Sequence, residues 1–139
     1  MTKTIAEAMS EYLDSVALAR SENTARTYRN GLETFKIVLD DHNLPTETTP
    51  VSELREDAIA WLAAGLKPYA PTTERLYLTA AAAFFEYLAA ERLAEPNLPR
   101  LRMLIRQRGR KQGQRLPQFP REDIERIVEY ANNIAGSPT

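Results

Sequence analysis

The chain has 139 residues, which is enough for one domain of about 100 residues with an extension and too few for two full domains. Hydrophobic residues make up 43% and charged residues 27%, the balance of a soluble globular protein, and the formal net charge is −1. The absence of cysteine excludes disulfides and thiolate chemistry, and a single histidine, His42, argues against an all-protein zinc site. No cofactor or small-molecule ligand is indicated.

The first predicted element is an amphipathic helix that begins after Thr4 and ends near Arg20. Thr4 and Glu7 have the spacing of a capping box, in which each side chain bonds the other residue's backbone N–H. One apolar stripe at helical period follows, made of Ile5, Met9, Tyr12, Leu13 and Val16. The extreme N-terminus lacks the apolar run of a secretory signal, so we expect a cytoplasmic protein.

The cluster of polar residues 21–24 predicts the cap of a second helix. Its apolar residues repeat at steps of three and four: Ala25, Tyr28, Leu32, Phe35 and Leu39. Gly31 in the interior costs ~1 kcal/mol relative to Ala, so we expect close helix packing there to compensate. The polar, proline-containing residues 40–50 predict a surface loop.

Two further helices are predicted before residue 95. Ser52 caps a short third helix, which Gly65 and Pro68 stop; its apolar residues are Leu54, Ala58, Ile59, Trp61 and Leu62. The fourth helix opens at residues 71–74 and runs to about Leu93. Residues 76–88 are apolar almost all round, which predicts a helix surrounded by the others and too short to cross a membrane.

The charges are strongly segregated along the chain. Residues 1–95 hold nine basic and fifteen acidic side chains, residues 96–121 hold eight and none, and residues 122–139 hold one and four. The acid-free stretch is a candidate phosphate-binding segment, with a solvated linker as the alternative. Prolines 96 and 99 break the preceding helix and glycines 109 and 113 loosen the stretch, although Leu101, Leu104 and Ile105 could support one short helix.

Residues 121–130 predict a last amphipathic helix, with an acidic first turn and with Ile124, Ile127 and Val128 on one side. No further element follows to pack against it. We therefore expect a chain truncated just inside a second domain.

Four helices, a basic linker and a further helix in this order resemble the N-terminal core-binding (SAM-like) domain of the tyrosine recombinase and phage integrase family. The residues that carry the resemblance lie in the second helix, in the fourth helix and in the linker exit: Ser21, Thr24, Tyr28, Leu32 and Phe35; Pro71 to Thr73, Phe84, Phe85, Tyr87, Leu88 and Glu95 to Asn97; Arg115 to Pro117 and Arg121 to Ile127.

The resemblance implies an all-α, four-helix core-binding bundle at residues 1–95. It implies a basic interdomain linker at 96–120 and the first helix of a truncated catalytic domain at 121–139. The nucleophilic tyrosine and the phosphate-binding residues of strand exchange would then lie beyond Thr139, so no enzyme activity and no catalytic residue are expected here. Family members assemble as oligomers on DNA, and the isolated chain is expected to be a monomer.

The resemblance also implies a partner, double-stranded DNA, and a set of contacts on the second helix, on the opening of the fourth and on the linker. The candidates are Asn23, Thr24, Arg26, Arg29, Lys36, Thr72, Thr73, Arg75, Arg100, Arg102, Arg106, Arg108, Arg110, Lys111 and Arg115. The fourth helix offers only Arg75 where the family usually has several basic residues. On the second helix, Glu22 and Glu33 could instead pair with the basic side chains.

Other readings of the sequence remain open. The six tyrosines sit in apolar stripes or lack a surrounding basic cluster, so we interpret them as structural, and His42 as an exposed loop residue. A rival hypothesis is a helical protein-interaction module whose acidic bundle binds a protein and whose basic tail is a solvated tether.

Overall fold

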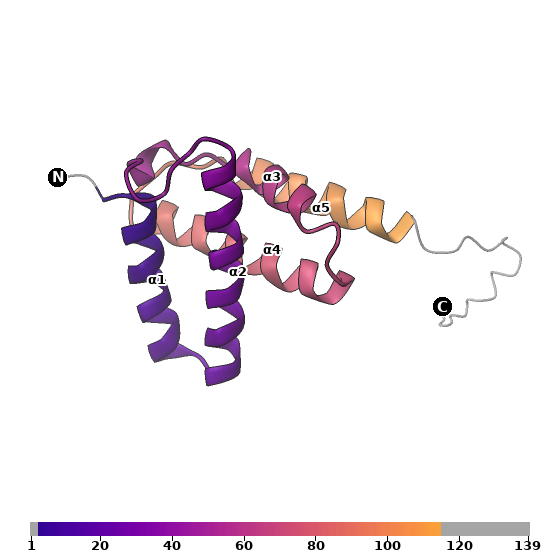
Figure 1. Ribbon diagram of the computed structural model, residues 1–139, viewed down its shortest axis with the longest axis horizontal. Coiled ribbons are helices and arrows are strands. Elements are labelled where there is room, and N and C mark those ends of the chain that lie inside the picture. Colours follow the sequence, from indigo (N-terminus) through magenta and orange to yellow (C-terminus); the bar gives the residue numbers. More distant parts are fainter. Residues whose placement is uncertain (1–2, 115–139) are drawn as a thin grey trace, which may run out of the picture. The chain divides into compact units, whose positions relative to one another are not determined.

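The computed structural model describes residues 3–114, with side chains up to Gln107. Within this range the chain forms α1 (Ile5–Ala19), α2 (Glu22–Asp41), the 3₁₀ helix η1 (Val51–Glu53), α3 (Ala58–Gly65), α4 (Pro71–Ala90) and α5 (Leu98–Gln114), and no strand (Figure 1). The predicted all-α fold is confirmed. The first compact unit of the chain ends at Arg108, within α5. The helix predicted at 121–130 lies outside the described residues.

Helices α1 and α2 form an antiparallel pair whose N-terminal caps were predicted (Figure 1). Thr4 Oγ1 accepts the Glu7 N–H at 3.1 Å, and Glu7 Oε1 accepts the Thr4 N–H at 3.0 Å, which confirms the capping box. Ser21 Oγ accepts the Thr24 N–H at 3.2 Å, so the chain reverses direction with the first turn of α2 satisfied.

The core is organised around α4. Its Phe84 ring lies 5.8 Å from the ring of Tyr12 on α1, and its Phe85 ring lies 5.9 Å from that of Phe35 on α2. The side chains of Phe84, Phe85 and Phe35 are fully buried. The prediction that other helices surround α4 holds for these positions, but Leu76 is 45% exposed, so the helix also has a solvent side.

Gly31 lies where α2 packs closely against α4. A Cβ atom at this position would lie 3.2 Å from the Ala80 Cβ, and 3.3 Å from Cδ1 and 3.4 Å from Cα of Tyr77. Two helix backbones can come this near only where one lacks a side chain. The close packing predicted to offset the helix-propensity cost of Gly31 is therefore present.

The predicted third helix is wrong at its start. The segment forms η1, then an extended residue, Leu54 (φ −78°, ψ 124°), and only then α3. Leu54 is fully buried and Glu56 is 5% exposed, so both side chains leave the surface before the helix begins. Because the backbone is extended at Leu54, the side chains of Leu54 and Glu56 can both point into the protein. In a continuous helix they would point to different sides.

The basic stretch after Pro96 is more regular than predicted. In place of one short helix in a loosened chain, α5 runs through both Gly109 and Gly113 to Gln114. The apolar residues that suggested a helix anchor it, because Leu101 is fully buried and Leu104 and Ile105 pack against the core. Tertiary burial thus supports the first turns of α5.

Candidate nucleic-acid interface

The N-terminal end of α2 brings several predicted contact residues together on an exposed surface. Arg26 Nη1 donates to Asn23 Oδ1 at 3.0 Å, so these two candidates are bonded to each other. Thr24 is half-buried, and its hydroxyl accepts from Ser21 Oγ at 3.0 Å. Both bonds are exposed, and they leave this end of the helix polar but not strongly cationic.

Arg20 joins this end of α2 although it was not predicted. Its guanidinium carbon lies 5.8 Å from the centre of the Tyr28 ring, within the range of a cation–π contact. The two residues belong to different helices, and helical spacing on one element does not connect them. Only the chain reversal at Ser21 brings Arg20 beside the predicted surface.

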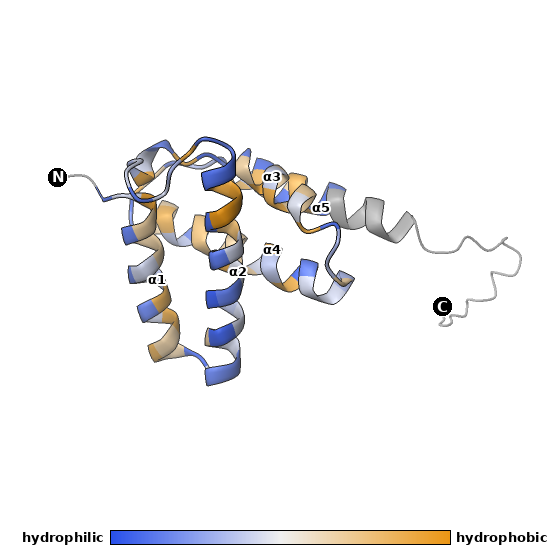
Figure 2. Ribbon diagram, in the orientation of Figure 1, coloured by the Kyte–Doolittle hydropathy of each residue, from blue (hydrophilic) through white to orange (hydrophobic). Residues whose placement is uncertain are grey.

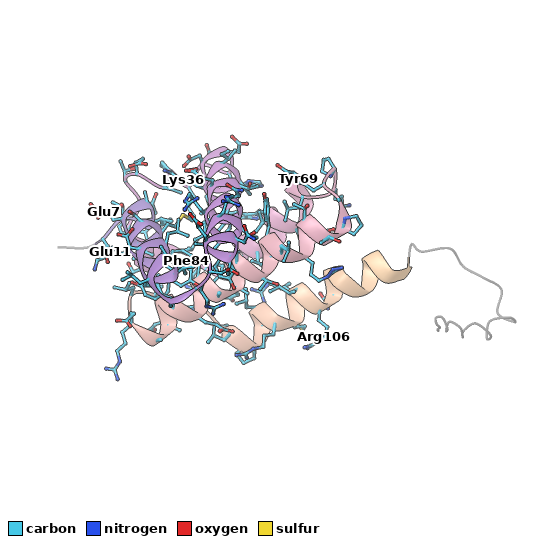
Figure 3. The ribbon with its side chains drawn as sticks, turned by 90° about the horizontal axis from the view of Figure 1, so that it is seen from below. Glu7, Glu11, Lys36, Tyr69, Phe84 and Arg106 are labelled. Carbon is cyan, nitrogen blue, oxygen red and sulfur yellow. The ribbon has the colours of Figure 1, made fainter. Side chains whose placement is uncertain are left out.

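Further along α2, Arg29 and Lys36 lie on the side facing α1. They line a hollow of about 360 Å³ together with apolar, hydroxyl and acidic side chains of both helices: Ala6, Met9, Ser10, Leu13, Asp14, Leu32 and Glu33. Lys36 Nζ pairs with Glu47 Oε2 at 3.1 Å, and this hydrogen bond raises the pKa of Lys36 (Figure 3). Lys36 thus pairs with the loop after α2, and not with Glu33 on its own helix, which was the alternative to DNA contact. Arg29 makes no ion pair with another described residue.

The surface of α2 is otherwise hydrophilic over much of its length (Figure 2). This pattern fits a helix that buries one stripe and leaves the rest to water. It does not by itself separate a DNA-facing helix from a solvated one.

The opening of α4 combines helix-terminal N–H groups with an acidic side chain. Ala70 provides no side-chain cap and Pro71 occupies the first turn. Thr72 and Arg75 are exposed and Thr73 is half-buried. Glu74 lies in the same turn and is only 5% exposed.

Three basic residues of α5 have described side chains. Arg100 is paired with acids, whereas Arg102 and Arg106 are exposed. Arg100 Nη1 bonds Glu56 Oε2 at 3.0 Å and also the Asp57 carboxylate. Arg102 Nη2 lies 3.9 Å from Glu86 Oε2, at the limit of an ion pair between two half-exposed side chains. Arg106 is exposed, extends from α5 on the side away from α4 (Figure 3), and has no ion pair among the described residues.

Comparison with known proteins decides the family. Residues 9–92 match the family model described as phage integrase, N-terminal SAM-like domain. The chain belongs to this family. The match begins within α1 and ends after α4 and before α5, so the basic residues of α5 lie outside it. No curated protein and no solved structure matches the chain.

In this SAM-like domain the described tyrosines serve packing. Tyr12 is 8% exposed and its ring lies 4.9 Å from that of Tyr87, and burial raises the pKa of Tyr12 to about 12. Tyr69 and Tyr77 pair at 6.0 Å beside the start of α4. A phenol whose pKa is raised by burial is a poor nucleophile near neutral pH.

His42 is exposed, as predicted, and it caps the C-terminus of α2. Its Nδ1 lies 2.9 Å from the Val38 carbonyl oxygen, and its ring stacks on Trp61 at 4.6 Å and 5°. Over residues 3–114 we find no group of three or more side chains suited to a metal ion and no helix able to cross a membrane.

The remaining linker candidates have no described side-chain position. Arg108, Arg110 and Lys111 belong to α5 by their backbone, whereas Arg115 lies outside the described residues. Sequence reasoning placed the basic candidates on α2, α4 and α5, and their contact with DNA stays a prediction. It did not distinguish Arg100, which faces the bundle, from Arg106, which faces solvent.

Proposed function

We propose that this chain binds double-stranded DNA as the core-binding domain of a tyrosine site-specific recombinase or integrase. The observation that carries the proposal is the pairing of an integrase SAM-like domain with the acid-free basic segment of residues 96–121. On this proposal the strand-exchange domain follows Thr139 in the parent protein, which works in the cytoplasm and assembles as an oligomer on DNA.

Guanidinium groups bind phosphate oxygens in a bidentate manner, so arginines without an internal partner are the best candidates for contact. Among the candidate contacts with described side chains, Arg29, Arg75 and Arg106 meet this condition. Such contacts fix the position of a protein on the duplex without selecting a sequence. The isolated chain is therefore expected to bind weakly and with little sequence preference.

The test is to replace Arg106, Arg108, Arg110 and Lys111 with Gln and to titrate a fluorescent duplex of random sequence. If all four contact phosphates, the slope of log K against log salt becomes less negative by about 3.6. The affinity of this variant for the duplex at about 50 mM salt should therefore be much lower than that of the wild type. An unchanged affinity in this variant contradicts the proposal.

A matched control removes the same charge elsewhere. Lys3, Arg55, Lys67 and Arg92 are four cations of the bundle outside the proposed contacts, and their replacement by Gln lowers the net charge equally. This variant should keep most of the affinity. Equal losses in the two variants would indicate attraction by net charge alone.

The rival function is a protein-interaction module, favoured by the six excess negative charges of residues 1–95. It predicts that the basic-segment variant still binds a protein partner fully. The two proposals therefore differ in the outcome of the same substitution.

A further inference from the structure

A buried carboxylate holds the beginning of α5. Glu56, before α3, has a side chain that is 6% exposed, yet both of its oxygens are bonded. Oε1 accepts the backbone N–H of Asn97 at 2.9 Å, and Oε2 accepts from Arg100 Nη1 at 3.0 Å. The Arg100 donor belongs to the first turn of α5, and the Asn97 donor belongs to the residue just before the helix.

The first turn of α5 also has an N-cap of its own. Asn97 Oδ1 accepts the Arg100 N–H at 3.0 Å, as an N-cap side chain does. Asn97 and Arg100 thus serve both the helix and Glu56. The adjacent Asp57 carboxylate bonds the same guanidinium from the solvent side.

Burial of Glu56 and docking of α5 depend on each other. A buried carboxylate is unfavourable unless each oxygen has a partner, and the start of α5 supplies partners for both oxygens. Detachment of α5 would leave the charge unsatisfied and would expose Leu101, which is fully buried. The bundle retains its own core around Phe84 and Phe85, so the loss of α5 need not unfold it.

We propose that Glu56 is a positioning residue that locks the first turns of α5 onto the bundle. In this role Arg100 belongs to the lock and is not a phosphate ligand. The lock fixes the places of Arg102 and Arg106 on the surface of the compact unit. The contact of Arg102 and Arg106 with DNA rests on the proposed function, whereas the attachment of α5 through Glu56 does not.

Hydrogen exchange of the full chain, without DNA, tests the lock. Glu56→Gln keeps the shape of the side chain and an acceptor for the Asn97 N–H, but it removes the charge that holds Arg100. Losing a charged hydrogen bond should speed exchange of the amides of residues 101–107 by about tenfold or more. Amides of α1, α2 and α4 should keep their rates.

The matched control is Glu53→Gln, which removes an exposed carboxylate of η1 three residues away. Equal exchange of residues 101–107 in the two variants would overturn the lock. So would faster exchange spread evenly over all helices, because that result describes ordinary core stability.

Arg100→Gln provides an independent second variant, since its side chain is 41% exposed and its loss leaves no cavity in the core. It should loosen the same amides as Glu56→Gln. The double variant should add little to Arg100→Gln, because both single changes remove the Glu56–Arg100 pair. Fully additive effects would contradict the proposed pairing.

Discussion

Glu56 shows how a single side chain can be recognised as structural or functional only from its partners. Burial alone raises its pKa, but hydrogen bonds from the Asn97 backbone and from Arg100 outweigh that effect, so its pKa lies below the ordinary value of 4.5. The folded protein therefore favours the charged form. In sequence Glu56 is one of fifteen acids in residues 1–95, and nothing in its neighbourhood marks it for burial.

The pH dependence of stability follows from this lowered pKa. The stabilisation is fully present above the unfolded pKa of Glu56, and it is lost as pH falls through the lower folded pKa. The difference in free energy of unfolding between wild type and Glu56→Gln should hence shrink as pH drops from 7 to below 4.5. Urea denaturation at several pH values measures it. A difference that stays constant or grows toward acid pH would contradict the assignment.

Gly31 gives a second prediction at the residue scale. Gly31→Ala gains ~1 kcal/mol of helix propensity, but its new methyl group meets the Ala80 Cβ at 3.2 Å and the Tyr77 backbone, neither of which can rotate away. We expect a net destabilisation of about 1 kcal/mol, measured by urea denaturation. Gly65→Ala is the control, because there the Cβ meets only the Val38 Cγ2 at 3.3 Å, at the end of a side chain. That change should be neutral or stabilising, and equal effects at the two glycines would refute the close-crossing explanation.

At the scale of elements, α1, α2 and α4 could be predicted from the sequence because local signals and tertiary packing agree there. The Thr4 and Ser21 caps and the apolar stripes all point to the observed helices. The sequence did not predict the break at Leu54 or the length of α5, because both depend on contacts between distant segments. Glu56 meets a partner 44 residues away, and no local pattern encodes such a pair.

The same limit applies to the candidate site. Basic residues could be placed on α2, α4 and α5 by periodicity and by the family resemblance. The sequence could not show which of these basic residues pair with acids, since Lys36 pairs with a loop residue and Arg100 pairs with the segment before α3. Arg20 approaches Tyr28 only because the α1–α2 turn folds back.

The central position of α4 leads to a prediction about its two sides. Phe84→Ala removes a fully buried ring that packs against α1, and it should lower the free energy of unfolding by about 3 to 5 kcal/mol. Leu76→Ala on the same helix removes a side chain that is 45% exposed, and its effect should stay within about 1 kcal/mol. Thermal or urea unfolding measures both. A small effect for Phe84→Ala would contradict the assignment of α4 as the core helix.

At the scale of the whole molecule, a net charge of −1 conceals an acidic bundle followed by a strongly basic segment. Attraction to DNA then depends on where the positive charges lie and on how many remain unpaired. Arg100 is held by two acids, so at most seven of the eight basic residues of 96–121 are left for phosphate. Each contact contributes about −0.9 to the salt slope, so this segment can supply at most about −6.

The salt dependence of DNA binding tests the central claim most directly. The full chain should bind a random-sequence duplex at about 50 mM salt and lose affinity on the order of 10³-fold by about 200 mM if six contacts form. The slope of log K against log salt should then be clearly negative. A slope near zero, or no binding by a chain that circular dichroism shows to be folded, would contradict the DNA-binding account and favour the protein-interaction function.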